Sequence, residues 1–392
     1  MSKTSWLRPL KATVLMVSVV LLGLFGTGLA QSSSLSVDSF TADFSAMKQL
    51  QQIASQGQGK IGVLLPETTT SARYTSFDAP YLKQAFEAAG LSSDQFIITN
   101  AQGSESTELT QAQSDISNGA TVLLMDPISS GVGASIEQYA KSHGVKVIDY
   151  DRLTLGGSRD FYVSFNNVEV GKLIGQGMVQ CIKAWNVQDP HLLIMRGAPT
   201  DNNATLFAQG YDGVLQPYFD NGTYTKVGEP AGTWDPAKAR TLFEQQYTAH
   251  QDINAVVTPN DANANAVISY LKTLNVPPKT FPTTGQDAQE TGLQNVLAGY
   301  QCGTVYKPIY LEAQGAAALA IYLRAGMQPP QGLVNGTTKD SQANTDVPSV
   351  LMTPIWVTPD NMAQTVVKDN FVDPKKLCAG HASQCTAAGI SY

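Results

Sequence analysis

Short apolar segments alternate with longer amphipathic segments from residue 60 onward. The short segments are rich in Val, Ile and Leu, as buried strands are. The longer ones place apolar residues three or four positions apart, which is the spacing of one helix face. Gly90 and Asn118-Gly119 end two of these helical segments. Strands are therefore predicted at residues 61–65, 96–99, 121–125, 145–148 and 161–165, with helices at 81–89, 105–116 and 136–142.

The same alternation starts again after residue 165. Strands are predicted at 191–195, 226–229, 255–258, 281–285 and 302–306, and helices at 168–185, 206–218, 236–250, 262–274 and 309–325. Strands that alternate with helices form right-handed βαβ units and parallel sheets. The pattern therefore predicts an α/β protein with two similar halves. A cleft between the halves is the expected ligand site.

Three segments lie outside this alternation. Residues 37–55 have scattered apolar positions and fit a helix that the glycines at 57 and 59 end. Residues 326–347 are rich in Gly, Pro and Asn and predict a long loop. Residues 349–357 predict one late strand.

The first 30 residues have the features of a secretion signal. A basic start is followed by an apolar run at 12–25 and by the small residues Gly28-Leu-Ala30. The apolar run is short for a spanning helix, which needs about 20 apolar residues. We expect a mature chain that begins near Gln31 and is periplasmic or extracellular. Residues 31–57 are expected to form an N-terminal leader.

The charge of the chain argues against a nucleic-acid partner. Loss of Lys3, Arg8 and Lys11 with the signal would leave 22 basic residues against 32 acidic ones. Nucleic-acid binding favours a basic face instead. The length of 392 residues exceeds what one hydrophobic core usually organises, so two domains are expected.

The four cysteines are an even number, which predicts disulfides in an exported chain. Cys378 and Cys385 are close in sequence and predict a small loop, which leaves Cys181 and Cys302 as the second pair. A metal site that uses His381 as a third ligand is the alternative, but no fourth ligand lies nearby in the sequence. No metal or cofactor is expected.

Polar residues follow several of the predicted strands. Asp151 and Arg152 come just past the strand at 145–148, and ligands of open α/β sheets bind outside the carboxyl ends of strands. Sugar hydroxyls both donate and accept hydrogen bonds, which a carboxylate beside a guanidinium can satisfy. Aromatic residues at Tyr74 and Trp234 could pack on the C–H face of a sugar ring. The other strand ends carry Arg73-Tyr74, Asp201-Asn202-Asn203, Asn260-Asp261, Gln286-Asp287 and Lys307.

Other interpretations of these residues remain open. Asp151 and Arg152 could form a surface ion pair, and Asp261 and Asp287 each precede a predicted helix that they could cap. A pair of carboxylates could also act in glycoside hydrolysis. No spacing selects two of them, and no nucleophile-elbow or phosphate-loop motif is present. We therefore expect no catalytic residue and no enzymatic activity.

The motifs of the chain resemble those of the periplasmic sugar-binding proteins of ABC transporters, in the ribose/galactose-type branch, and most of all its D-xylose-binding members. The resemblance extends from about residue 60 to residue 372, in the order and spacing of that family. It rests on Tyr150-Asp-Arg152, Phe161-Tyr-Val-Ser-Phe165, Pro199-Thr-Asp-Asn-Asn-Ala204, Asn260-Asp-Ala262, Gly285-Gln-Asp-Ala288 and Thr304-Val-Tyr-Lys-Pro308.

The resemblance implies two Rossmann-like lobes of the periplasmic binding protein type I fold, with the ligand cleft between them. Three crossover segments, near Ser164, Gly303 and Leu351, would join the lobes. The first lobe would comprise residues 58–163 and 304–350. The second would comprise residues 164–303 and 351–392, including the tail that carries two cysteines.

The resemblance also implies a set of sugar contacts. Tyr74 stands where the D-xylose-binding members have a tryptophan, and the preceding segment, residues 66–72, differs in sequence and is one residue longer. Asn202 and Asp261 are neighbours that would support the contacts. The residues expected at the ligand are Arg73, Tyr74, Asp151, Arg152, Asn202, Asn203, Trp234, Asn260, Asp261, Asp287 and Lys307.

The expected function is therefore that of an exported monomeric receptor. It would bind a monosaccharide, with D-xylose as the first choice, and deliver it to a membrane ABC permease as the lobes close. The alternatives are a receptor for glucose, arabinose or ribose, a sensory sugar-binding domain, and a secreted glycoside-processing enzyme.

Overall fold

The computed structural model of the protein describes residues 35–71 and 73–392. The predicted secretion signal and residues 31–34 of the predicted leader lie outside the described residues. The strands are β1 (Lys60–Leu65), β2 (Phe96–Asn100), β3 (Ala120–Met125), β4 (Lys146–Tyr150), β5 (Phe161–Phe165), β6 (His191–Ile194), β7 (Thr225–Gly228), β8 (Ala255–Val257), β9 (Thr304–Tyr306), β10 (Gly336–Asp340), β11 (Thr345–Met352) and β12 (Ile355–Val357).

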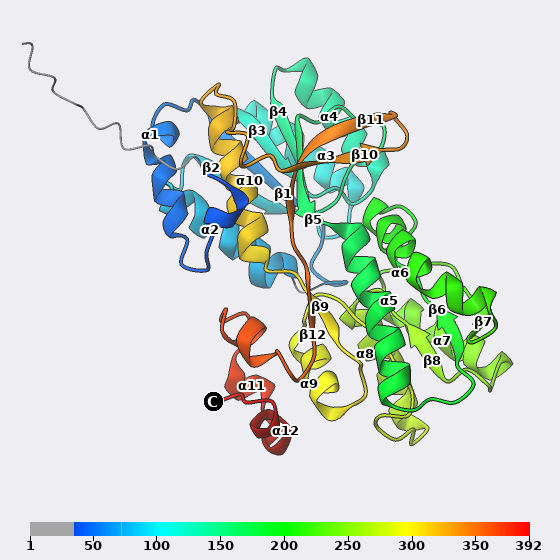
Figure 1. Cartoon of the computed structure of the whole chain (residues 1–392). Helices are drawn as coiled ribbons and strands as arrows, with labels where there is room; N and C mark the ends of the chain where they lie inside the picture. The colour runs from blue at the N-terminus through cyan, green and yellow to red at the C-terminus, as the bar shows by residue number, and fades with distance from the viewer. Residues whose placement is uncertain (1–34, 72) are drawn as a thin grey trace, which may run out of the picture. The chain divides into compact units, whose positions relative to one another are not determined.

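Helices follow most of these strands (Figure 1). The α-helices are α1 (Gln51–Ala54), α2 (Ala79–Ala88), α3 (Glu105–Ser117), α4 (Ser130–Ser142), α5 (Asn167–Ala184), α6 (Asn202–Asp220), α7 (Pro236–Ala249), α8 (Asp261–Thr273), α9 (Glu290–Ala298), α10 (Ile309–Arg324), α11 (Pro374–Leu377) and α12 (Ala382–Ala387). Short 3₁₀ or π turns are η1 (Val37–Ser39), η2 (Ser45–Leu50), η3 (Tyr74–Asp78) and η4 (Ala363–Val367).

Two sheets organise two lobes. The sheet of the first lobe has the order β10-β11-β5-β4-β3-β1-β2, and every neighbouring pair except β10 and β11 is parallel. The sheet of the second lobe has the order β7-β6-β8 and is parallel too. Both follow the strand–helix alternation of the sequence. The predicted α/β fold with two Rossmann-like lobes is confirmed.

The predicted strand at 281–285 is reduced to isolated bridges. Val256 bridges to Thr283, and Gln286 bridges to Val305, so this segment connects β8 with the antiparallel pair of β9 and β12. The segment therefore still runs alongside the second-lobe sheet. Its carboxyl end points toward the same edge as the end of β8.

The chain crosses between the lobes after β5, β9 and β11. Helix α10 comes after β9, yet its apolar side chains are buried against the first-lobe sheet. Because β9 pairs with β12, strand pairing favours a crossing after Tyr306 rather than at Gly303. With β9 counted in the second lobe, the first lobe resumes after Tyr306, and the division into lobes otherwise stays a prediction.

The predicted loop at 326–347 contains a strand and the start of another, which is a correction. Residues 336–352 form the antiparallel hairpin β10–β11, and β11 then pairs with β5. The sequence obscures β10 because it is an edge strand, Gly-Thr-Thr-Lys-Asp, without an apolar side chain. The predicted single late strand at 349–357 is likewise two strands, β11 and β12, which belong to different sheets.

The described part of the predicted leader packs on the first lobe and is not a separate segment. Phe40, Phe44, Met47 and Leu50 are buried in the same apolar cluster as β1 and α10. The side chain of Gln314 in α10 donates a hydrogen bond of 2.9 Å to the carbonyl of Thr41. These apolar positions stabilise the segment against α10.

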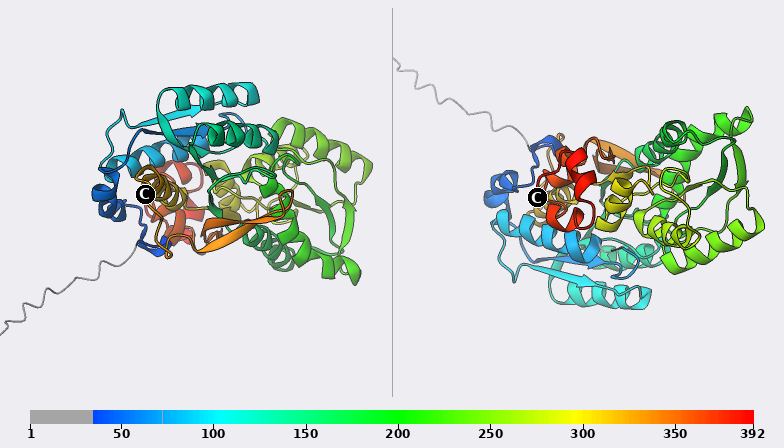
Figure 2. Two further views of the ribbon diagram at one scale, coloured as in Figure 1. Left: turned by 90° about the horizontal axis from the view of Figure 1, so that it is seen from above. Right: turned by 90° about the horizontal axis from the view of Figure 1, so that it is seen from below.

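The C-terminal segment, residues 371–392, contributes to a small apolar cluster of its own. Leu377, Cys378 and Cys385 are buried together with residues of α9, and Figures 1 and 2 show α11 and α12 next to α9. The structure pairs Cys378 with Cys385 and Cys181 with Cys302. Among residues 35–71 and 73–392, no helix is long and apolar enough to cross a membrane.

Candidate functional site

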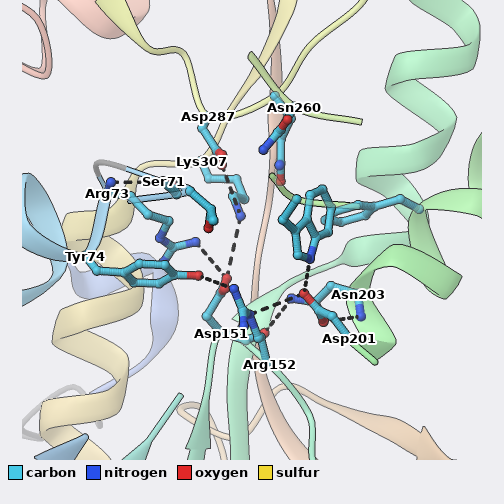
Figure 3. Close-up of a pocket in the computed structure, with 14 residues that line it drawn as sticks. Ser71, Arg73, Tyr74, Asp151, Arg152, Asp201, Asn203, Asn260, Asp287 and Lys307 are labelled. Carbon is cyan, nitrogen blue, oxygen red and sulfur yellow. Dashed lines mark hydrogen bonds and ion pairs between the residues drawn. The ribbon is translucent and has the colours of Figure 1, made fainter. Parts of the chain in front are cut away.

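A pocket lies where strand ends of the two lobes face each other (Figure 3). Its walls are rich in charged and amide side chains, with a few aromatic rings between them. It is lined by Thr70, Ser71, Arg73, Tyr74, Asp151, Arg152, Asp201, Asn203, Phe207, Trp234, Asn260, Gln286, Asp287 and Lys307. The structure thus brings together nine of the eleven residues that the sequence predicted at the ligand.

Two of the three aspartates that line the pocket, Asp151 and Asp287, occupy corresponding places in the two lobes. Asp151 directly follows β4, and Asp287 follows the bridge that Gln286 makes with β9. Both have a positive φ, 57° at Asp151 and 89° at Asp287, a region that non-glycine residues seldom adopt. Such backbone strain is concentrated at functional sites, where the surrounding structure holds it in place.

Arg73 is held by three carboxylates. Its Nη1 donates to Oδ1 of Asp151 at 2.7 Å, and its Nη2 donates to Asp78 at 2.7 Å and to Glu312 at 2.8 Å. The side chain is only 3% exposed. The guanidinium is therefore fixed in position, and its charge is compensated inside the first lobe.

Lys307 connects the two aspartates. Its Nζ lies 3.6 Å from Asp151 and 3.5 Å from Asp287, and it also lies 5.9 Å from the centre of the Phe165 ring. Oδ1 of Asp287 is buried without a hydrogen-bond partner among the described residues. The cation therefore joins a carboxylate of the first lobe to one of the second.

Asp151 is ionised over nearly the whole pH range. Burial raises the pKa of its carboxyl, but the charges of Arg73, Lys307 and Arg152 outweigh burial and hold the pKa at about 2. A carboxylate of this kind accepts hydrogen bonds and donates none. It is thus a fixed acceptor at the centre of the pocket.

Arg152 spans the cleft from the side opposite Lys307. Its Nη2 donates to the hydroxyl of Tyr74 at 2.9 Å, and its Nε lies 3.3 Å from Asp201 of the second lobe and 3.5 Å from Asp126 of the first. The guanidinium also lies over the Tyr74 ring, 5.7 Å from its centre. Arg152 is thus a donor next to a flat aromatic face.

Three further predicted residues reach the pocket from the second lobe. Asn203, in the first turn of α6, donates through Nδ2 to the carbonyl of Asp151 at 2.9 Å. Asn260 caps α8, since its side chain accepts from the backbone of Asn263 at 3.0 Å. Trp234 donates through Nε1 to Asp201 at 3.1 Å, which fixes the orientation of its ring.

Asn202 and Asp261 do not line the pocket, which corrects their grouping with the contacts. Asp261 is fully buried and accepts hydrogen bonds from the side chains of Gln301 and Thr304 and from the backbone of Gln289. It joins second-lobe loops and does not face the cleft. The helix caps are also placed differently, because Asn260 caps α8 while neither Asp261 nor Asp287 caps a helix.

Five lining residues were outside the predicted contacts. Asp201 and Gln286 stand at strand ends that the sequence did identify. Phe207 lies one helical turn after Asn203 in α6, so helical spacing from a predicted contact could have found it. The remaining two are Thr70 and Ser71.

Glu67 holds the segment that carries Thr70 and Ser71. Its buried carboxylate accepts hydrogen bonds from the backbone of Thr70 at 2.7 Å and of Ser71 at 3.0 Å, and from the Thr70 hydroxyl at 2.6 Å. No strand or helix pattern predicts such a turn. These two residues were missed because their position depends on one acidic side chain.

The pocket has the donors and acceptors that a polyhydroxylated ligand requires. Its free volume is about 30 Å³, which is room for about two water molecules. The Arg73–Asp151 and Lys307–Asp287 contacts occupy the space that ligand hydroxyls would need, so a ring-sized ligand requires the lobes or these side chains to move. In the described part of the chain, no cluster of His, Cys, Asp and Glu could hold a metal ion.

Comparison with known proteins finds relatives that are named as periplasmic sugar-binding proteins. The chain is 37% identical over 282 residues to the D-xylose-binding periplasmic protein of Escherichia coli, which covers 71% of this chain and 82% of the relative. It is 30% identical to the multiple sugar-binding periplasmic protein SbpA of Azospirillum brasilense, over 81% of this chain and 90% of the relative.

A search of solved structures also finds a sugar-binding protein of a transporter. A carbohydrate transporter solute binding protein from Chloroflexus aurantiacus, in complex with D-glucose, aligns with a TM-score of 0.72 and 27% identity, over 81% of this chain and 97% of that one. The family model described as periplasmic binding protein domain matches residues 61–328. This chain, with its type I fold and its pocket between two lobes, therefore belongs to the periplasmic binding protein family.

Proposed function

We propose that this protein is an exported receptor that captures a monosaccharide, with D-xylose as its preferred ligand, and delivers it to an ABC permease. The observation that carries the proposal is the pairing of donors and acceptors across the cleft. Asp151 and Arg152 come from the first lobe, and Asn203, Asn260 and Asp287 from the second. A sugar bound by both sets stabilises the closed arrangement of the lobes.

The cleft suits reversible capture and not a chemical step. Arg73 and Lys307 hold Asp151 as a charged acceptor. The matched relatives in Escherichia coli and Azospirillum brasilense are named as sugar-binding periplasmic proteins. We therefore propose a binder without turnover that acts as a monomer in the periplasm or outside the cell.

Xylose is the first choice because of the similarity to relatives that are named as D-xylose-binding periplasmic proteins. A hexopyranose adds a hydroxymethyl group, for which a pocket fitted to a pentose has no room. D-Glucose is the second candidate, since the Chloroflexus aurantiacus neighbour is in complex with D-glucose.

Calorimetric titration of the refolded, sugar-free protein tests the proposal. D-Xylose, D-glucose, L-arabinose and D-ribose are compared at one pH. We expect the tightest binding with D-xylose. Tight binding of glucose or arabinose without heat from xylose would refute the choice of sugar. Absence of heat from every monosaccharide would refute the receptor function.

A further inference from the structure

A larger cavity adjoins the sugar pocket. It has a volume of about 420 Å³, and Ser71, Arg73 and Asp287 line both spaces. Sites for small ligands usually enclose about 300–1,000 Å³. We call this space the side chamber. Its size fits a small organic ligand, and the three shared residues place it directly beside the sugar pocket.

The C-terminal segment builds one wall of the side chamber. Phe371 stacks on Phe77 of the first lobe, with ring centres 4.1 Å apart and planes inclined by 10°. The Phe371 ring also packs against the Tyr306 ring, with ring centres 4.8 Å apart and planes inclined by 60°. Nearby, Asp369 accepts hydrogen bonds of 3.1 Å from the hydroxyls of Tyr306 and Tyr310.

This wall has a fixed position and lies outside the family match. The family model ends at residue 328, whereas the wall is formed by residues 371–376. Gln294 of α9 donates to the carbonyl of Lys376 at 3.1 Å, which ties the segment to the second lobe. The wall of the side chamber is therefore held to the second lobe by residues that lie beyond the family-model match.

The lining of the side chamber favours a neutral ligand with hydroxyl groups. Ser76, Thr291 and Gln289 offer hydroxyl and amide groups, and the half-buried ring of Phe77, which is stacked on Phe371, adds an apolar surface. The side chamber also contains more acidic than basic groups, because three carboxylates already compensate Arg73. Asp287 is paired with Lys307, and the remaining charged residues of the lining are the acidic Glu290 and Asp373 and the basic Lys376. This balance disfavours anionic ligands such as sugar phosphates.

We propose that the side chamber is a second sugar subsite, so that the protein also binds a neutral disaccharide. One ring would occupy the sugar pocket and the other would lie against Phe77. The inference rests on the proposed function for the first ring. It adds a ligand class, a disaccharide of the preferred monosaccharide, and assigns a role to the C-terminal segment.

Titration with D-xylose and with β-1,4-xylobiose tests the inference. We expect xylobiose to bind with a Kd within tenfold of that of xylose. Binding of xylose with no measurable binding of xylobiose would overturn the inference and leave the proposed function intact. Heat from xylobiose without heat from any monosaccharide would reject the proposed function and support the side chamber. Absence of heat from both would reject both proposals.

Substitutions in the side chamber provide the sharper test. Ser76→Trp places a large ring into it from an exposed position of η3, and Thr291→Trp does so from α9. In either variant we expect the ratio of the xylobiose Kd to the xylose Kd to rise at least tenfold. The matched control is Ser135→Trp on the exposed face of α4, which should leave the ratio unchanged. An unchanged ratio in both side-chamber variants would overturn the inference.

Discussion

Arg73 and Asp151 form an ion pair of 2.7 Å at the centre of the cleft, with side chains that are 3% and 6% exposed. Arg73 has two further carboxylate partners, whereas Asp151 also faces Lys307. The two residues therefore have different roles. Arg73 is built into the first lobe, and Asp151 connects that lobe to the ligand space.

Asp151→Ala should weaken sugar binding at least tenfold. Loss of the carboxylate leaves buried donors unpaired, which costs about 1–3 kcal/mol, and 1.4 kcal/mol corresponds to one decade of affinity. The fold should persist, because Arg73 keeps Asp78 and Glu312. Calorimetric titration measures the affinity, with the exposed Asp94→Ala as control. An unchanged Kd in Asp151→Ala would contradict the proposed site.

Asp287→Ala tests the second lobe in the same way. We again expect a loss of at least tenfold in affinity, since 1.4 kcal/mol is one decade and Lys307 loses its second-lobe partner. The variant should remain folded, as judged by circular dichroism, because Asp287 serves the cleft and not a core. If only Asp151→Ala weakened binding, the ligand would contact the first lobe alone, and the bridging arrangement would be wrong.

Glu108 should make the stability of the protein fall as pH rises. Burial raises the pKa of its carboxyl from 4.5 to about 8, although the backbone N–H of Ile128 lowers it. The folded state then binds more protons than the unfolded state between about pH 4.5 and 8. The contribution of Glu108 to stability is therefore fully present below about pH 4.5 and lost as pH rises toward 8.

Glu108→Gln removes this titration. Urea unfolding at pH 5, 6, 7 and 8 should show that the variant gains stability relative to the native protein as pH rises, by about 1.4 kcal/mol per pH unit at most. Glu87→Gln, at an exposed position, is the control and should keep the native pH dependence. Parallel pH curves for Glu108→Gln and the native protein would show that Glu108 does not titrate in this range.

The two cysteine pairs should contribute unequally to stability. Cys181 and Cys302 are 121 residues apart, and Cys378 and Cys385 only 7. Chain entropy predicts a contribution of about 4–5 kcal/mol for the first pair and about 2 kcal/mol for the second. Urea unfolding of Cys181→Ser/Cys302→Ser and of Cys378→Ser/Cys385→Ser compares them. Four reactive thiols in the unfolded, unreduced mature protein would contradict both bonds.

Incubation with xylose, xylosides and xylo-oligosaccharides should leave all of them unchanged. The reason is that each carboxylate of the pocket is paired with a cation of the chain, Asp151 with Arg73, Asp201 with Arg152 and Asp287 with Lys307, whereas glycoside hydrolysis requires a carboxyl that donates a proton. Chromatography of the sugars after incubation is the measurement. Product that forms with the native protein and disappears in Asp151→Ala or Asp287→Ala would favour the enzyme interpretation.

The sequence by itself determined the strands, the helices that follow them and the chemistry at the strand ends. Buried parallel strands require continuous apolar runs, so the segment before Asp151 was identified from local pattern alone. Since ligands bind at the carboxyl ends of such strands, Asp151, Arg152 and Lys307 could be predicted as pocket residues. Local pattern did not identify β10, whose polar edge strand has no apolar run.

Only the tertiary structure decided which of these side chains meet. Asp261 and Asn260 are adjacent in sequence, yet Asp261 is buried among second-lobe loops while Asn260 lines the pocket. Thr70 and Ser71 reach the pocket because Glu67 holds their turn, and Phe371 reaches Phe77 from the far end of the chain. These contacts depend on distances between segments remote in sequence, and local periodicity carries no information about such distances.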